Sequence, residues 1–590
     1  MTLDYCYLFT ITAMVLGMLR AGVLGATCPP PCACAGASVD CSHRGLTSVP
    51  ADLPPSTQQL YLRNNSISSI PVDLTSSLPQ LQVLDLQGNQ ITRVPVTTFQ
   101  DLAGIRALDL SYNLLTEIPS RAFQKTSAHK ACRDASCFVD VRHNPLRTIR
   151  RYAFAWMRGL AVFIGESRME LAIHSHAFYG LNGVPLVQLS GVKELNLDNS
   201  LFIAPNISNI EFKDSNIPVL KSYSFKDTRN VRRIRFVDCI ITDVEKGAFS
   251  GIVYAAGNSS SLTELQFTGC SLSVLPSEAF TDTNLESVSI TNSNIRELEP
   301  NIFWGMSNLQ AVDIINSSFP NISSRVFSGL SHVHKILLHN NKMSSVESNA
   351  FSESMHISHI SIRQSPGTSL HVKNDAFRDL SQVGTLHIDA VNMLDLAPSA
   401  FSGLVDVETL RFSRVTIPLL RAHAFSGLTR VGHLHARDVR IAGLEGYEAL
   451  RPMATGTSIT RVSLEGVSLP CNCPSMLAYP RAMELFTNNN VTCLDQQTNR
   501  TMLDGGLITA MQDECRPPLV GGAASTVHPA SFLFPSTVCL FYVWPLSFPG
   551  DEVVLLVCPI SNFNFVLPTM IFFLLKRIYY CFPHRRGACL

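Results

Sequence analysis

Closely spaced cysteines are the residues of this chain best suited to chemistry, because its CxC pairs could serve either zinc binding or disulfide bonding. They form two clusters, the first of Cys28, Cys32, Cys34 and Cys41 and the second of Cys471, Cys473, Cys493 and Cys515. The apolar run at residues 5–19 predicts a secretory signal peptide over residues 1–26, with an N-terminal membrane anchor as the alternative. Secretion places cysteines in an oxidising compartment. We therefore expect disulfides at both clusters, and no metal or other cofactor.

Four further cysteines lie between the clusters. Cys132 and Cys137 are predicted to pair with each other, a free thiol being the alternative. We interpret Cys239 and Cys270 as small buried residues, with a disulfide between them as the alternative. Sequons of the N-x-S/T type also fit a glycosylated secretory product. They are Asn64, Asn206, Asn258, Asn316, Asn321, Asn490 and Asn499.

Catalytic motifs do not stand out in the sequence. We find no Gly-rich phosphate loop after a strand, no H-E-x-x-H and no G-x-S-x-G. Lys and Arg together number 46, as do Asp and Glu, so no overall charge favours nucleic acid. The expectation is a binding protein rather than an enzyme.

A repeat of about 24 residues organises the chain, with the pattern LxxLxLxxNxIxxVxxxxFxxL. Leu81, Leu84, Leu86, Asn89 and Phe99 exemplify it. About 17 units are expected over residues 57–469, with the unit at 160 degenerate and the unit at 192 truncated. The units begin near residues 57, 81, 105, 136, 160, 192, 207, 231, 262, 285, 309, 333, 357, 383, 407, 431 and 459.

The repeat predicts an α/β solenoid. Each LxxLxL segment forms a short strand, and because one unit cannot bury its apolar face alone, the units stack into a horseshoe with a long parallel concave sheet. The convex side is expected to be short 3-10 or irregular structure, with the Phe packed beneath it. The Asn amide can satisfy backbone groups of neighbouring coils.

The Asn position changes along the chain. Asn is kept at Asn65, Asn89, Asn113, Asn144 and Asn341. Small residues replace it at Ser215, Cys239, Cys270, Ser293, Ser317 and Ser365, and valine at Val391, Val415, Val439 and Val467. Because valine cannot form hydrogen bonds through its side chain, we expect the C-terminal coils to be less regular.

These repeats and cysteine clusters resemble the extracellular leucine-rich-repeat family with typical 24-residue units, an architecture shared by Slit, Toll-like receptor ectodomains and the acid-labile subunit. The resemblance implies an N-terminal cap over residues 28–56 and a C-terminal cap over residues 470–516, each closed by two disulfides. For the C-terminal cap it implies the pairs Cys471–Cys493 and Cys473–Cys515. The chain departs from Toll-like receptors in showing no TIR domain.

The concave sheet is where we expect a ligand, because its outward strand positions form a pre-organised surface. A basic, histidine-rich patch is predicted there, made of His334, Lys335, His339, His359, Arg363, His387, Arg411, His433, His435 and Arg437. A second basic strand contains Arg232, Arg233 and Arg235, while the units at 192 and 309 present Glu194, Asp198 and Asp313. The patch would suit an extracellular acidic protein surface or an acidic glycan, bound more tightly at low pH. The alternative is a row of ordinary solvated residues.

The tail after the second cysteine cluster changes character. Residues 517–552 contain a linker and a first apolar segment, residues 553–575 form a candidate transmembrane helix, and residues 576–590 form a short basic cytoplasmic tail. The sequence thus predicts a single-pass plasma-membrane recognition or adhesion protein. The alternative is a secreted or matrix-associated binding protein. Homodimerisation is compatible with either.

Overall fold

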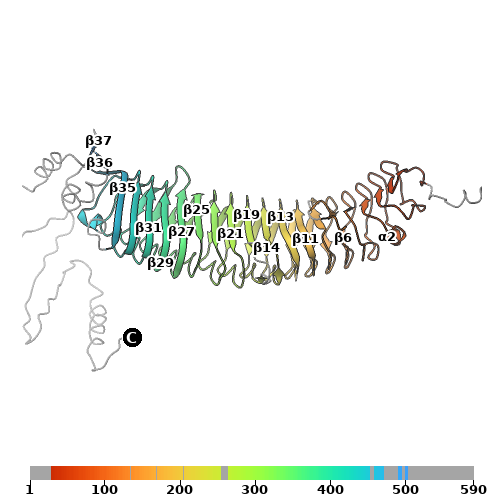
Figure 1. Cartoon of the computed structure of the whole chain (residues 1–590), viewed down its shortest axis with the longest axis horizontal. Coiled ribbons are helices and arrows are strands. Elements are labelled where there is room, and N and C mark those ends of the chain that lie inside the picture. The colour runs from red at the N-terminus through yellow and green to blue at the C-terminus, as the bar shows by residue number, and fades with distance from the viewer. Residues whose placement is uncertain are drawn as a thin grey trace, which may run out of the picture. The chain divides into compact units, whose positions relative to one another are not determined.

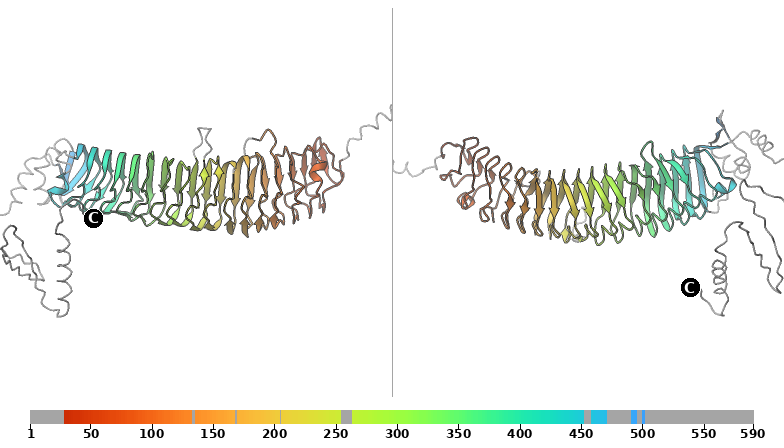
Figure 2. Two further views of the ribbon diagram at one scale, coloured as in Figure 1. Left: turned by 90° about the horizontal axis from the view of Figure 1, so that it is seen from below. Right: turned by 180° about the vertical axis from the view of Figure 1, so that it is seen from behind.

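The computed structural model describes residues 28–132, 135–167, 169–203, 205–253, 263–451, 458–470, 490–494 and 499–501. These residues form a stack of parallel β-coils, seen from three sides in Figures 1 and 2. The predicted signal peptide (1–26) and all residues after 501 lie outside the described residues. Within the described part, there is no helix both long and apolar enough to cross a membrane. The predicted segment 553–575 is not among the residues searched.

One strand from each of about 17 coils enters the main parallel sheet, which confirms the predicted solenoid. Neighbouring strands pair in register along the sequence. The strands are β3 (Gln59–Tyr61), β4 (Val83–Asp85), β5 (Ala107–Asp109), β7 (Phe138–Asp140), β9 (Ala161–Gly165), β11 (Asn182–Ser190), β13 (Asn206–Lys213), β16 (Arg233–Val237), β19 (Glu264–Thr268), β21 (Ser287–Thr291), β23 (Ala311–Ile315), β25 (Lys335–Asn341), β27 (Ser354–Gln364), β29 (Leu380–Asp389), β31 (Val405–Ser413), β33 (Thr429–Arg437) and β35 (Ile459–Pro470).

Shorter parallel strands run along a flank of the coils. They are β6 (Glu117–Ile118), β8 (Thr148–Ile149), β10 (Glu170–Ile173), β12 (Glu194–Leu197), β14 (Asn216–Leu220), β17 (Ile240–Val244), β20 (Ser271–Leu275), β22 (Asn294–Leu298), β24 (Asn321–Ile322), β26 (Ser345–Val346), β28 (Ser369–Val372), β30 (Asn392–Leu396), β32 (Thr416–Ile417) and β34 (Arg440–Ile441). A further pair, β15 (Thr228–Arg229) and β18 (Ile252–Val253), is parallel as well. The named helical elements are α2 (Leu74–Ser77) and the 3-10 turn η1 (Tyr447–Ala449), and Arg451 is also helical.

The unit predicted to begin at residue 192 is misplaced. Val184, Val187 and Leu189 are the buried positions of β11, which pairs with β9 and β13 in the main sheet. Residues 194–197 instead form β12, which pairs with β10 on the flank. The sequence 184–189 fits the same apolar spacing as 192–197, so periodicity alone did not separate the two. Glu194 and Asp198 therefore do not lie on the main sheet.

Stacked phenylalanines fill the space under the convex turns, as predicted. Consecutive rings lie 4.9 to 6.2 Å apart between centroids and are nearly parallel. Each coil thus contacts mainly its two neighbours, the arrangement expected of a repeat protein. The column contains Phe99, Phe123, Phe154, Phe178, Phe202, Phe225, Phe249, Phe280, Phe303, Phe327, Phe351, Phe377, Phe401 and Phe425.

The predicted asparagine ladder is present in the N-terminal coils. Asn113 Nδ2 donates to the carbonyls of Leu86 and Leu110, and its Oδ1 accepts from the Ile91 amide at 3.0 Å. At the later position assigned to Ser365, the structure places Gln364 instead. The Gln364 side chain is buried and pairs in register with Asn341. The register shift between β25 and β27 explains the one-residue difference.

The C-terminal coils are not less regular, contrary to the prediction. Their main strands are the longest, 11 residues in β27 and 12 in β35, against three in β3 and β4. Where valine replaces asparagine, backbone groups bond directly between coils: the Thr416 amide donates to the Val391 carbonyl at 3.0 Å. The backbone therefore supplies the bonds that the side chain lacks.

The N-terminal cap contains the expected two disulfides, Cys28–Cys34 and Cys32–Cys41, beside the antiparallel pair β1 (Ala33–Ala35) and β2 (Ser38–Asp40). The predicted Cys132–Cys137 disulfide is also present. Cys239 and Cys270 are free and buried, as interpreted from sequence.

The structure describes only residues 490–494 and 499–501 of the predicted C-terminal cap after its first residue, Pro470. Two strands lie there, β36 (Asn490–Leu494) and the antiparallel β37 (Asn499–Thr501). The Cys493 side chain and the other three cysteines of the predicted pairs lie outside the described part.

Candidate functional site

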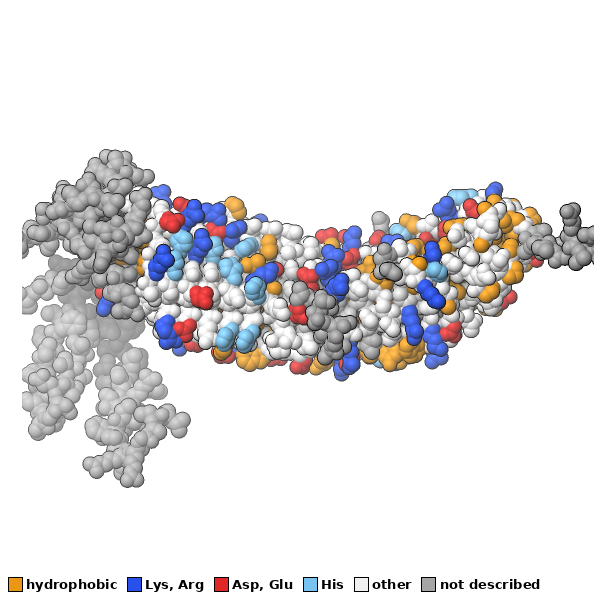
Figure 3. Space-filling model, viewed as in Figure 1, with side chains coloured by type: hydrophobic (Ala, Val, Ile, Leu, Met, Phe, Trp, Pro, Cys, Tyr) orange, Lys and Arg blue, Asp and Glu red, His pale blue; other side chains and the backbone are white. Residues whose placement is uncertain are grey.

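The predicted basic patch lies on the main sheet between β25 and β35. Basic and histidine side chains gather at this end of the repeats in Figure 3. The register aligns three outward positions of each strand into rows across the sheet. The middle row passes from Ser361 through His387, Arg411 and His435 to Ser463. Another row brings Lys335 beside His359, and a third brings Ser413 beside Arg437. The structure therefore brings the predicted residues together, except that exposed His334 precedes β25.

Serine hydroxyls fix several of the imidazoles. His339 Nε2 lies 2.7 Å from Ser361 Oγ, and His387 Nε2 lies 3.1 Å from Ser413 Oγ. His433 makes the same kind of contact with Ser463, at 2.9 Å. In each case the serine belongs to the following strand. These contacts hold the rings in place and leave a surface of defined shape.

Acidic neighbours neutralise part of the patch. Lys335 Nζ lies 2.7 Å from Asp313 Oδ2. The Asp389 carboxylate, only 2% exposed, pairs with both Arg363 and Arg414. Burial works against ionisation of Asp389, but the hydrogen bonds from Arg414 and Arg363 still lower its pKa. Lys335, Arg363 and Arg414 therefore already have acidic partners within the protein, which leaves less of their charge for a ligand.

Arg411 differs from these cations in its charged neighbours. It lies between His387 and His435 in the middle row, and its Nε donates to Ser413 Oγ at 3.4 Å. Within the described residues no carboxylate lies within ion-pair distance of its guanidinium. An uncompensated guanidinium at the centre of a sheet is well placed to bind a carboxylate or sulfate of a ligand.

Four histidines of the patch, His339, His359, His387 and His433, have a pKa below that of histidine in water. Burial, opposed partly by Asp389 and aided by Arg411, lowers the pKa of His387 to about 4. Burial and Arg363 lower the pKa of His339, while burial and His334 lower that of His359. The imidazoles therefore gain charge only in conditions more acidic than the ordinary histidine range. The predicted low-pH tightening shifts to correspondingly lower pH.

The second basic strand is largely compensated. Arg233 Nε lies 3.0 Å from Glu264 Oε2, and Arg235 Nη1 lies 3.3 Å from Glu211 Oε2. Arg232 is exposed and precedes β16. Because both in-strand arginines already have acidic partners, this strand offers less free charge than Arg411.

Sequence reasoning missed an acidic row at the N-terminal end of the same sheet. The middle row there contains Asp40, Tyr61, Asp85, Asp109 and Asp140 in neighbouring strands. Burial and the neighbouring aspartate raise the pKa of Asp109 despite its bonds with Ser111. The recurring aspartate between the second and third leucine positions of the repeat could have revealed this row.

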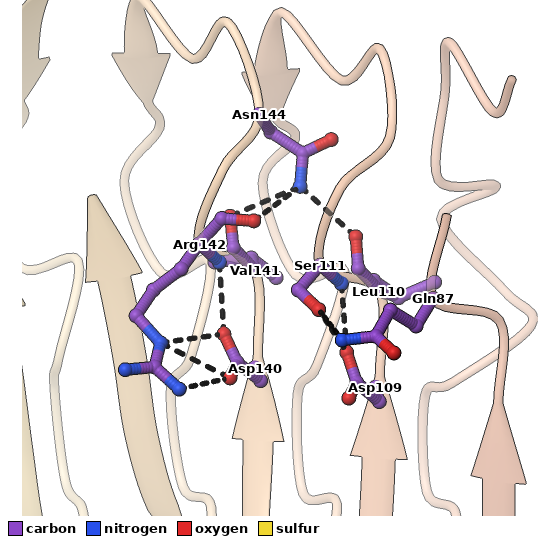
Figure 4. Close-up of polar contacts among 8 residues, drawn as sticks. All are labelled: Gln87, Asp109, Leu110, Ser111, Asp140, Val141, Arg142 and Asn144. Atoms are coloured by element: carbon purple, nitrogen blue, oxygen red, sulfur yellow. Dashed lines mark hydrogen bonds and ion pairs between the residues drawn. The ribbon is translucent and has the colours of Figure 1, made fainter. Parts of the chain in front are cut away.

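The acidic row also has a structural role. Figure 4 shows Asp109 receiving hydrogen bonds from the Ser111 amide and hydroxyl, and Asp140 receiving bonds from the Arg142 amide and guanidinium. The Asp140–Arg142 contact measures 2.6 Å. Each aspartate thus caps the end of its own strand.

Known families match most of the repeats. A leucine-rich-repeat model matches residues 55–115 and 79–128, and a BspA-type leucine-rich-repeat region model matches residues 140–255 and 252–383. A leucine-rich-repeat N-terminal domain model matches residues 27–54, the segment that holds both cap disulfides.

Curated relatives match a short part of the chain. The platelet glycoprotein Ib beta chain of Mus musculus is 41% identical over 75 residues, which are 12% of this chain and 35% of the relative. Platelet glycoprotein IX of Homo sapiens is 49% identical over 63 residues, 10% of this chain and 35% of the relative. Leucine-rich repeat-containing protein 3B of Bos taurus is 46% identical over 61 residues, which are 10% of this chain and 24% of the relative. The chain spans about a third or less of these relatives.

Solved structures align over more of the chain. The Drosophila Toll–Spatzle complex aligns over 76% of this chain and 77% of that chain, with 13% identity and a TM-score of 0.38. A chain from a complex of Latrophilin 3, Unc5D and FLRT2 aligns over 80% of this chain and 96% of its own length, with 15% identity and a TM-score of 0.32. The repeat and cap models, together with the coils and cap disulfides of the structure, show that this chain belongs to the extracellular leucine-rich-repeat family.

Proposed function

We propose that this chain is a cell-surface recognition or adhesion protein that binds an acidic extracellular protein through the C-terminal half of its main sheet. The observation that carries the proposal is Arg411, an uncompensated guanidinium in a row with His387 and His435. Serine hydroxyls hold the imidazole of His387 beside it and that of His433 on the next strand, so little freedom of these side chains is lost on binding. An arginine fork pairs with carboxylates in a bidentate manner, which suits aspartate or glutamate side chains of a partner.

The partner would meet a surface that is basic at one end and acidic at the other. The middle row runs from Asp85 and Asp109 to Arg411 and His435. Such a gradient selects the orientation of a bound protein, because the reversed orientation would place like charges together. The predicted apolar segment 553–575 would anchor the repeats at the cell surface.

Charge reversal provides the test. The full chain would be screened against a panel of extracellular proteins and against immobilised heparin, and every binder would be measured again with Arg411→Glu. Arg440→Glu is the matched control, since Arg440 is an exposed cation of the flank strand β34. We expect at least one acidic protein to bind, with affinity at least tenfold weaker in Arg411→Glu and unchanged in Arg440→Glu.

Two results would contradict this proposal. Protein binders that tolerate Arg411→Glu would remove the patch as the binding surface. Retention on heparin alone, lost in Arg411→Glu, would assign the patch to a sulfated glycan instead. Surface biotinylation tests the membrane anchor: full-length protein in clarified medium would favour the secreted or matrix-associated alternative.

A further inference from the structure

An unusual tryptophan lies on the convex side of the N-terminal coils, away from the main sheet. Each coil turns there through a residue with positive φ, and most coils use glycine or a small acidic residue, as at Gly180, Asp227 and Gly251. Trp156 occupies this place with φ of 57° and is 40% exposed. A side chain in the left-handed region is disfavoured because its Cβ comes close to the following carbonyl oxygen. Exposure of a large aromatic ring at a strained position calls for an explanation beyond folding.

Neighbouring residues hold the indole in place. The Tyr179 ring packs edge-on against it, with centroids 5.4 Å apart, and Tyr152 stacks nearly parallel at 6.3 Å. The indole also crosses Gly180 so closely that a Cβ there would come within 2.8 Å of Trp156 Cδ1. The coil after Trp156 therefore leaves room for the ring. The result is a fixed aromatic wall.

The indole borders a cavity of about 440 Å³ whose other walls are polar. Its lining consists of Asp101, Gln124, Lys125, Ser127, Trp156 and Arg158. Gln124 is only 8% exposed, and its Oε1 has no hydrogen-bond partner among the described residues. A buried acceptor without a donor is costly, and because this atom has almost no accessible surface, a ligand hydroxyl or amide would reach it only after the Gln124 side chain turns toward the cavity.

We infer that this cavity is a second binding site, for a pyranose sugar that carries a carboxylate. One aromatic wall and five polar residues match a pyranose ring, whose apolar C–H face can stack on the indole while its hydroxyls both donate and accept. Once turned toward the cavity, Gln124 Oε1 would accept from a hydroxyl.

Two cations, Lys125 and Arg158, line the cavity and favour a ligand that carries a carboxylate. Lys125 Nζ already lies 3.6 Å from Asp101 Oδ1. Arg158 is exposed and, among the described residues, has no ion pair. Its guanidinium is therefore free for the sugar carboxylate.

The test uses calorimetric titration of the full chain after treatment with a sialidase. The probes are 3′-sialyllactose, a hyaluronan tetrasaccharide and, as the neutral comparator, lactose. Variants are Trp156→Gly, which restores the residue used by the next coil, and Arg158→Gln. Trp304→Ala is the matched control, because Trp304 is 42% exposed in a distant coil.

We expect at least one acidic probe to bind, at least tenfold more weakly in Trp156→Gly and in Arg158→Gln, and equally in Trp304→Ala. Lactose should bind at least tenfold more weakly than that probe. The site is overturned if neither acidic probe binds at about 10 mM, if Trp156→Gly binds as well as the natural chain, or if lactose binds equally. Because Arg411 lies on the main sheet, Arg411→Glu should leave saccharide binding intact, which separates this site from the proposed function.

Discussion

The coils before and after about residue 200 close the turn that follows the main strand in different ways. In the earlier coils an asparagine side chain bonds to two coils at once, as Asn113 does with Leu86, Leu110 and Ile91. In most later coils a smaller or apolar side chain is buried there, with Asn341 and Gln364 as the exceptions. The amide one residue further on bonds to the carbonyl of the ladder residue itself in the preceding coil, as Thr416 does to Val391 and Arg440 to Val415, whereas in the earlier coils Leu114 bonds to Ile91, two residues beyond the ladder position.

This difference explains why the flank strand begins earlier in several later coils, although its length varies from five residues in β14 and β17 to two in β32 and β34. Once the amide after the ladder position bonds to the carbonyl of the ladder residue itself, pairing can begin there. β14, β17, β20 and β22 begin one residue after Ser215, Cys239, Cys270 and Ser293, respectively. The early flank strands β6 and β8 begin further along and contain two residues each. The same repeat therefore tolerates loss of asparagine by moving its hydrogen bonds from side chain to backbone.

The largest loss of folding stability is expected for a substitution at Asn113. Asn113→Ala removes the partner of the buried Ile91 amide and of the Leu86 carbonyl, whereas Ser293→Ala removes one shared hydroxyl. We expect the free energy of unfolding to fall by about 3 kcal/mol for Asn113→Ala and by about 1 kcal/mol for Ser293→Ala. Urea unfolding measures both, and hydrogen exchange of the Ile91 amide locates the loss. Gln90→Ala, at an exposed neighbour, is the control. Equal losses in the two variants would contradict the distinction.

The reciprocal change tests the later coils. Val415 is 1% exposed, and its carbonyl is already bonded to the Arg440 amide. Val415→Asn would bury an amide where the backbone has used its own partners, so we expect a loss of about 2 kcal/mol. Thr416→Asn, at the next and partly exposed position, should cost much less. A stabilised Val415→Asn variant in urea unfolding would show that an asparagine ladder can form here, and the two regions would then be equivalent.

Sequence periodicity was sufficient for the solenoid, the asparagine ladder and the phenylalanine column, because each depends on one residue type at a fixed spacing. It failed where two segments satisfy the same spacing, as at residues 184–189 and 192–197, and where a register shift puts Gln364 at the place expected for Ser365. It also placed the cations of the patch without their partners. Asp389 pairs with Arg363 and Arg414 only because three strands are adjacent. Trp156 was missed because its significance depends on backbone φ.

The smallest predicted effect is on the pH dependence of the free energy of unfolding, and it comes from His387 in the C-terminal half of the main sheet. The folded-state pKa of His387 is about 4, below the ordinary value of about 6.5, so the unfolded chain takes up the proton first as pH falls. The stability contribution is therefore complete above about pH 6.5 and is lost as pH falls toward 4. With solvent screening of this partly exposed ring, we expect about 1 kcal/mol of loss between pH 7.4 and 5.0.

His387→Gln should remove that part of the pH dependence in urea unfolding, while His334→Gln, at an exposed histidine, is the control. An unchanged pH profile in His387→Gln would contradict the assignment. The same reasoning extends to binding, because a ring that stays neutral to about pH 4 cannot supply charge at pH 5.5. His387 would then add nothing to the attraction that Arg411 exerts at pH 5.5. A ligand whose affinity rises steeply between pH 7.4 and 5.5, and does so equally in His387→Gln, must be sensing other titratable groups.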